Sequence, residues 1–139
     1  MSKVPHGAFC WNELVTSNVE GAKAFYTETI GWTFQGMPMP DGGQYWCAMV
    51  DDRPVAGILD MAVIKTLPPG TPPHWFSYLE VDDIDARVEK ARAAGAMIAR
   101  EPWDVPNVGR IAVIIDPTGG AVGWMTSANA SEAADAAAG

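Results

Sequence analysis

The first half of the chain alternates between apolar runs and polar turns in a way that predicts one helix among several strands. Residues 8–15 have the aromatic and β-branched content of a strand. Asn18 is a candidate N-cap, and Gly31 stands where a C-terminal glycine would end the helix. After the helix we expect a Pro- and Gly-rich loop, a strand, a short turn and a second strand, at residues 36–43, 45–50, 51–54 and 55–63.

The second half repeats this order of elements after a connector at residues 65–73, which is rich in Pro and Gly. A strand at 75–81 is followed by a helix that Asp82 or Asp83 caps and Gly95 ends. The remaining elements are a short strand, a loop, and two strands joined by a turn, at residues 97–99, 101–109, 110–115, 116–120 and 121–126.

Each predicted helix carries an apolar stripe that we expect to face a sheet. The stripe residues are Ala22, Phe25, Tyr26 and Ile30 in the first helix, and Ile84, Val88 and Ala91 in the second. One half is too small to close a core alone, so two βαβββ modules sharing a sheet surface are predicted. This is an α+β fold with one domain over residues 1–126, in modules of about 8–64 and 74–126. Residues 127–139 are Ala-rich without large apolar side chains, which is typical of a flexible tail.

Charge and composition exclude several classes of function. The net charge of −8 argues against a nucleic-acid partner, which usually meets a basic surface. No apolar run approaches the ~20 residues of a membrane span, and the N-terminus has no secretory h-region. The two cysteines, Cys10 and Cys47, are expected to be buried reduced thiols, so we expect a cytoplasmic protein.

Four fragments of the sequence, in order along the chain, carry a family likeness. They are Asn18 to Tyr26 with the following Ile30-Gly31-Trp32, Val81 to Asp85 with Gly95, Gly109-Arg110, and Asp116 to Gly119. Together they resemble the vicinal oxygen chelate superfamily, which includes glyoxalase I, bleomycin-resistance proteins and extradiol dioxygenases. Residues 10–14 and 75–78 further resemble its single-domain, glyoxalase-like or hydroxylase-like subgroup.

The resemblance implies a cupped mixed sheet that binds a divalent metal through His or Glu side chains. The corresponding positions in this chain are Trp11, Phe76 and Gly123, none of which can coordinate a metal. We therefore predict no metal and no cofactor. A metal site built from substituted ligands, such as Glu13 with His74, is a weaker alternative. Relatives in the family commonly dimerise, so a homodimer is expected.

Because side chains alternate between the two faces of a strand, the sequence predicts which residues would line the implied cup. If Trp11 points into it, Glu13 does too, and Phe76 brings Tyr78 along. Six tryptophans in a small chain suit a pocket with flat apolar walls. The predicted ligand-binding residues are Trp11, Phe76, Arg110, Trp103 and Met125.

Two functions remain open at this point. One is a metal-independent protein that binds a small apolar or aromatic molecule, in the manner of bleomycin-resistance proteins. The other is a metal-independent isomerase, lyase, cyclase or hydroxylase-like enzyme that uses Glu13 and Tyr78 as acid and base. A carboxylate on a central strand must be paired, hydrated or functional. Glu13 is therefore either a catalytic group or a structural one that pairs with Arg110 or Tyr78.

Overall fold

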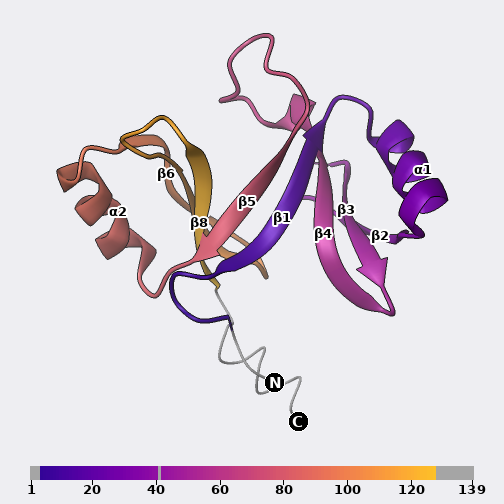
Figure 1. Ribbon diagram of the computed structural model, residues 1–139, viewed down its shortest axis with the longest axis horizontal. Coiled ribbons are helices and arrows are strands. Elements are labelled where there is room, and N and C mark those ends of the chain that lie inside the picture. Colours follow the sequence, from indigo (N-terminus) through magenta and orange to yellow (C-terminus); the bar gives the residue numbers. More distant parts are fainter. Residues whose placement is uncertain (1–3, 41, 128–139) are drawn as a thin grey trace. The chain divides into compact units, whose positions relative to one another are not determined.

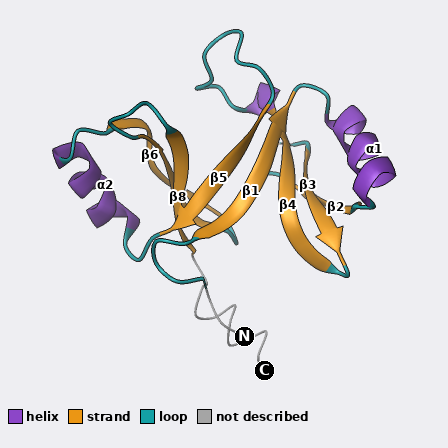
Figure 2. Cartoon of the chain, in the orientation of Figure 1, coloured by secondary structure: helices purple, strands orange, loops and turns teal. Residues whose placement is uncertain are grey.

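A computed structural model describes residues 4–40 and 42–127 (Figure 1). The chain divides into two compact units. The central unit is Trp11–Phe76, and the terminal unit combines the residues before and after it, Met1–Cys10 and Ser77–Gly139. Among the residues that the structure describes, each unit has one α-helix and four strands. Figure 2 colours the helices and strands differently.

The central unit has its strands in the order β2-β3-β4-β1. β1 runs parallel to β4, and the β2–β3 and β3–β4 pairs are antiparallel. The elements in chain order are β1 (Phe9–Thr16), α1 (Val19–Ile30), β2 (Thr33–Pro38), β3 (Gln44–Val50), β4 (Arg53–Asp60) and the 3₁₀ turn η1 (Met61–Val63).

The terminal unit repeats this topology with the strand order β5-β8-β7-β6. β5 is parallel to β8, and the β7–β8 and β6–β7 pairs are antiparallel. Its elements are β5 (His74–Glu80), α2 (Ile84–Ala93), β6 (Met97–Val105), β7 (Gly109–Ile115) and β8 (Ala121–Ser127). The α+β class and the two βαβββ modules are thus confirmed.

Side-chain caps begin the two helices where the sequence predicts. The Asn18 side chain accepts a hydrogen bond from Gly21 N at 2.9 Å, and α1 ends at Gly31 with a φ of 80°. Asp83, rather than Asp82, caps α2 by accepting from Ala86 N at 3.2 Å.

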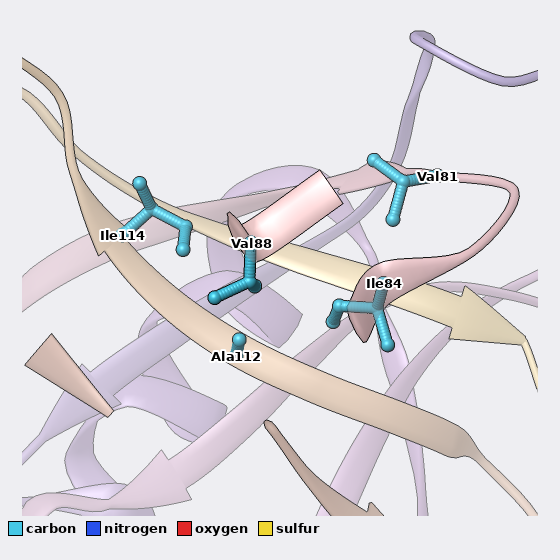
Figure 3. Packing of buried hydrophobic residues seen from close by; sticks show 5 residues of the cluster. All are labelled: Val81, Ile84, Val88, Ala112 and Ile114. Atoms are coloured by element: carbon cyan, nitrogen blue, oxygen red, sulfur yellow. The ribbon is translucent and has the colours of Figure 1, made fainter. Parts of the chain in front are cut away.

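The core of the terminal unit lies between α2 and its sheet (Figure 3). Ile84 and Val88 lie in α2, and Val81 lies three residues before the helix. All three pack against Ala112 and Ile114 of β7. The predicted stripe of α2 is confirmed, since Ile84, Val88 and Ala91 are all buried. Burial of such a stripe is the main source of helix stability in proteins.

The predicted stripe of α1 is only partly correct. No α1 residue is buried, and Phe25 and Ile30 are 56% and 59% exposed. The sheet contributes the buried residues of the central unit instead, with Ala48 and Ile58 fully buried. Tyr26 packs its ring on Trp32 and Trp75, at centroid distances of 5.1 and 5.8 Å.

Three predicted boundaries were wrong because strand pairing overrides local composition. Residues 36–38 belong to β2 rather than to a loop, since Gly36 pairs with Trp46 across the ladder. Residues 101–105 belong to β6, where Trp103 pairs with Ile111. β4 ends at Asp60, whose carboxylate caps η1 through Ala62 N.

The division into a single domain with a connector at 65–73 stays a prediction. β8 ends at Ser127, and the rest of the predicted tail lies outside the described residues. Within the described part of the chain, neither helix is long and apolar enough to cross a membrane.

Candidate functional site

The register of β1, β4 and β3 brings three positions to one side of the central sheet. Glu13 on β1 is opposite Gly57 on β4, and Gly57 is opposite Cys47 on β3. Because side chains alternate along a strand, Trp11 shares the side of Glu13, and Tyr45 shares the side of Cys47. We call this side the open face of the central unit.

The open face points away from α1. Trp46, the neighbour of Tyr45 on β3, receives the Lys23 ammonium of α1 at 3.3 Å from its ring centroid. Consecutive residues on a strand point to opposite sides, so Tyr45 and its partners lie on the side without the helix. Figure 1 shows α1 lying next to β2, β3 and β4.

Three side chains on the open face form a hydrogen-bonded chain. Trp11 Nε1 donates to the Tyr45 hydroxyl at 2.8 Å, and that hydroxyl donates to Glu13 Oε1 at 2.9 Å. Glu13 is only 7% exposed, whereas the two aromatic rings are half-buried. The Tyr45 hydroxyl thus satisfies one oxygen of a buried carboxylate, which would otherwise be costly to bury. We call these residues the Trp11–Tyr45–Glu13 cluster.

Gly57 makes this arrangement possible. A Cβ atom at position 57 would lie 1.6 Å from the Tyr45 hydroxyl oxygen and 2.2 Å from Cζ. The tyrosine on β3 therefore reaches the two β1 residues by passing directly over the glycine of β4. Neither Tyr45 nor Gly57 was predicted as a site residue, because only the strand order brings them to Glu13.

Three other predicted site residues lie on β5 and β8. Phe76 is half-buried on β5 and lies edge-on to the His74 ring, at 6.5 Å between centroids. In the terminal unit, Tyr78 pairs with Gly123 across β5 and β8, and the buried Met125 follows on the same side of β8. Their roles as ligand contacts or catalytic groups stay predictions.

Arg110 and Trp103 are both paired with charged groups inside the terminal unit. Arg110 donates to the two carboxylate oxygens of Asp85 at 2.9 and 3.1 Å and forms an ion pair with Asp104 at 3.3 Å. The Arg100 guanidinium lies 3.5 Å from the centroid of the Trp103 ring. Any ligand that used either side chain would have to share it with these partners.

A second buried carboxylate, Glu80, lies in the terminal unit. It accepts hydrogen bonds from Ser127 N at 3.0 Å and from Ser127 Oγ at 2.7 Å. Burial, and next the charge of Glu80, raise the pKa of the Cys10 thiol to about 11. Cys10 is therefore a neutral thiol at physiological pH. Cys10 and Cys47 are half-buried, rather than fully buried as the sequence predicts.

A surface pocket of about 520 Å³ lies elsewhere on the central unit, and none of the predicted site residues line it. Its lining residues come from the start of α1, the β2–β3 hairpin and the end of β4: Ser17, Asn18, Val19, Glu20, Met39, Gly43, Gln44, Trp46, Asp60 and Val63.

Comparison with known families now assigns this fold. The sequence profile of the glyoxalase/bleomycin resistance protein/dioxygenase superfamily matches residues 6–122. The chain belongs to this superfamily. The likeness read from the sequence motifs is thereby confirmed.

Curated members of the superfamily are similar to this chain. "Putative glyoxylase CFP32" of Mycobacterium tuberculosis is 41% identical over 81% of the chain and 41% of its own length. "Anthracycline biosynthesis protein DnrV" of Streptomyces peucetius is 32% identical over 87% of the chain and 47% of its own length. The chain thus spans less than half the length of the curated relatives that it matches.

Solved structures of the superfamily share the fold. Methylmalonyl-CoA epimerase from Mycobacterium tuberculosis superposes with a TM-score of 0.64 at 19% identity, covering 96% of this chain and 97% of its own. A protein from Bacillus halodurans gives a TM-score of 0.65 at 13% identity, covering 88% and 96%.

The residues at the positions that the sequence likeness assigns to metal ligands do not fit a divalent metal. The ring nitrogen of Trp11 carries a hydrogen that it donates to Tyr45, and Gly123 has no side chain. Among the described residues, no three His, Cys, Asp or Glu side chains gather closely enough to hold a metal ion. His74, the alternative ligand, directs Nδ1 to the Pro72 carbonyl at 2.8 Å.

Proposed function

We propose that this superfamily member binds a small apolar or aromatic molecule on the open face of its central unit, at the Trp11–Tyr45–Glu13 cluster. The observation that carries the proposal is the hydrogen-bonded chain itself. It fixes two half-buried aromatic rings beside a buried carboxylate on the face of the central sheet that is opposite to α1. Flat apolar walls with a few fixed polar groups are the usual composition of small-molecule sites.

The names of two relatives support the aromatic class of ligand. "Anthracycline biosynthesis protein DnrV" and its counterpart DauV of a Streptomyces strain are 32% and 31% identical to this chain. Anthracyclines are flat polycyclic aromatic molecules, and stacking on indole and phenol rings is the natural way to hold such a shape.

A titration with 2-naphthol, a flat two-ring aromatic, tests the proposal. Isothermal titration calorimetry of the full chain should detect binding, and Trp11→Ala should weaken it at least tenfold, or by about 1.4 kcal/mol. Trp32→Ala is the matched control, because Trp32 packs on Tyr26 and Trp75 away from the cluster. Equal affinity in wild type and Trp11→Ala would refute the proposed site.

A second candidate is an enzyme that uses Glu13, with Tyr78, as acid and base. The burial of Glu13 and its fixed hydrogen bond from Tyr45 favour this candidate, because a positioned carboxylate is a common general base. If it is correct, Glu13→Gln removes turnover of the bound molecule while binding persists. If it is incorrect, wild type leaves every bound ligand chemically unchanged.

The proposal includes a cytoplasmic homodimer that acts without a metal or cofactor. Elemental analysis of protein purified without chelator tests metal independence. A stoichiometric zinc, iron, manganese or nickel content would contradict it. Light scattering behind a sizing column tests the dimer.

A further inference from the structure

Each hydrogen-bond donor of the Trp11–Tyr45–Glu13 cluster already binds another side chain of the cluster. An indole and a phenol each have one donor, and an ionised carboxylate has none. The Trp11 N–H points to the Tyr45 oxygen at 2.8 Å, and the Tyr45 O–H points to Glu13 Oε1 at 2.9 Å. A ligand at the cluster therefore meets apolar ring surface and acceptor oxygens, and no donor from these three side chains.

The surrounding open face continues this pattern. The Cys47 thiol lies beside Tyr45 on β3 and donates to Met37 Sδ at 3.5 Å, so its weak donor is also used. Among β1 to β4, the one cationic side chain is Arg53 at the start of β4. By strand rise it lies about 13 Å from Gly57, too far to neutralise an anion at Glu13.

We infer that the cluster selects aromatic ligands that carry a hydroxyl or amino donor and rejects aromatic anions. This inference rests on the proposed function and specifies its ligand class. A carboxylate has about four acceptor positions, so Glu13 can accept from Tyr45 and from other donors at the same time. A donor on the ligand gains a charge-assisted hydrogen bond. A ligand carboxylate loses its hydration, finds no donor among the three cluster side chains, and is repelled by Glu13 and by the net charge of −8.

Three ligands with one ring system test the selectivity at pH 7.5. They are 2-naphthol, 2-naphthylmethylammonium and 2-naphthoate, which are a neutral donor, a cationic donor and an anion. We expect the full chain to bind each of the first two at least tenfold more tightly than 2-naphthoate. If 2-naphthoate binds equally well and Trp11→Ala weakens it, the inference fails while the proposed function stands. If none of the three binds, both fail.

Two substitutions locate the selectivity at the cluster. Glu13→Gln removes the charge and adds amide donors, so the preference for 2-naphthylmethylammonium over 2-naphthoate should fall at least tenfold. Tyr45→Phe, which frees the Trp11 N–H for a ligand, should shift the preference in the same direction. If the Glu13→Gln variant fails to fold, the Tyr45→Phe variant still tests the inference.

Glu20→Gln is the matched control. It makes the same change of charge on an exposed residue of α1, on the side of the sheet away from the cluster. It should leave the preference unchanged. An equal loss of preference in Glu20→Gln and Glu13→Gln would show that overall charge, rather than the cluster, discriminates, and would overturn the inference.

Discussion

Gly57→Ala is expected to break the cluster although none of its three members is substituted. A methyl group at position 57 would stand 1.6 Å from the Tyr45 hydroxyl oxygen and 2.2 Å from Cζ. The ring must move, and both hydrogen bonds of its hydroxyl are lost, to Trp11 at 2.8 Å and to Glu13 at 2.9 Å.

The expected loss in the free energy of unfolding follows from these two hydrogen bonds. A neutral hydrogen bond contributes about 0.5–1.5 kcal/mol to stability, and one to a charged group about 1.5–3 kcal/mol. Replacing glycine by alanine inside a strand recovers about 0.5–1 kcal/mol, because the unfolded chain loses conformational freedom. The net expectation is a loss of roughly 1–4 kcal/mol in the free energy of unfolding.

Urea unfolding of a double-mutant cycle measures this directly. In a Tyr45→Ala background there is no ring to displace, so Gly57→Ala should cost nothing or stabilise slightly. The gain from replacing glycine is the same in both backgrounds, so the coupling energy between the two positions should equal the loss of the two hydrogen bonds, about 2–4.5 kcal/mol. A Gly57→Ala substitution that is neutral in wild type, or that costs the same in both backgrounds, would refute the reasoning.

Four further outcomes follow from the terminal unit. Ile114→Ala should lower the free energy of unfolding by about 2–5 kcal/mol in urea titrations, because Ile114 is 1% exposed in the α2 core. Iodoacetamide should label Cys10 slowly at pH 8 and faster toward pH 11 in mass-spectrometric time courses, since burial raises its pKa to about 11. The stability that its neutral thiol contributes should be lost as the pH rises from 9 toward 11. The Arg87 guanidinium, which donates two hydrogen bonds to Asp82, holds the pKa of that carboxyl well below its usual 3.8. Asp82→Asn should therefore lower the melting temperature above pH 3.8, and the difference should shrink as the pH falls further below that value.

Local chemistry made most of the fold predictable. Asn18 and Asp83 begin the helices by capping backbone amides, and Gly31 follows the first helix in the left-handed conformation. Because these signals act between residues that are close in the sequence, they can be recognised from the sequence alone. The strand in which Gly36 pairs with Trp46 was missed because its composition resembles a loop, and only the partner strand makes it regular.

The candidate site was predictable only in part. Strand alternation correctly placed Trp11 and Glu13 on one side of β1. The partner of Glu13 was not foreseen, because Tyr45 reaches it through the order β3-β4-β1 and the absence of a side chain at Gly57. Arg110, considered as a partner for Glu13, forms its ion pairs with Asp85 and Asp104. Such long-range pairings depend on tertiary register, which no local pattern encodes.

The most direct test of the ligand site is a ¹H–¹⁵N spectrum of the tryptophan indole groups during titration with 2-naphthol. The chain has six tryptophans, and the Trp11 signal is assigned from its loss in Trp11→Phe. We expect the Trp11 Nε1–H resonance to shift as 2-naphthol saturates its site, because a ligand on the Trp11 ring perturbs the hydrogen bond to Tyr45. The Trp124 resonance, from a side chain beside the α2 core, should stay in place. A titration that moves other indole signals and leaves the Trp11 signal unchanged would contradict binding at the Trp11–Tyr45–Glu13 cluster.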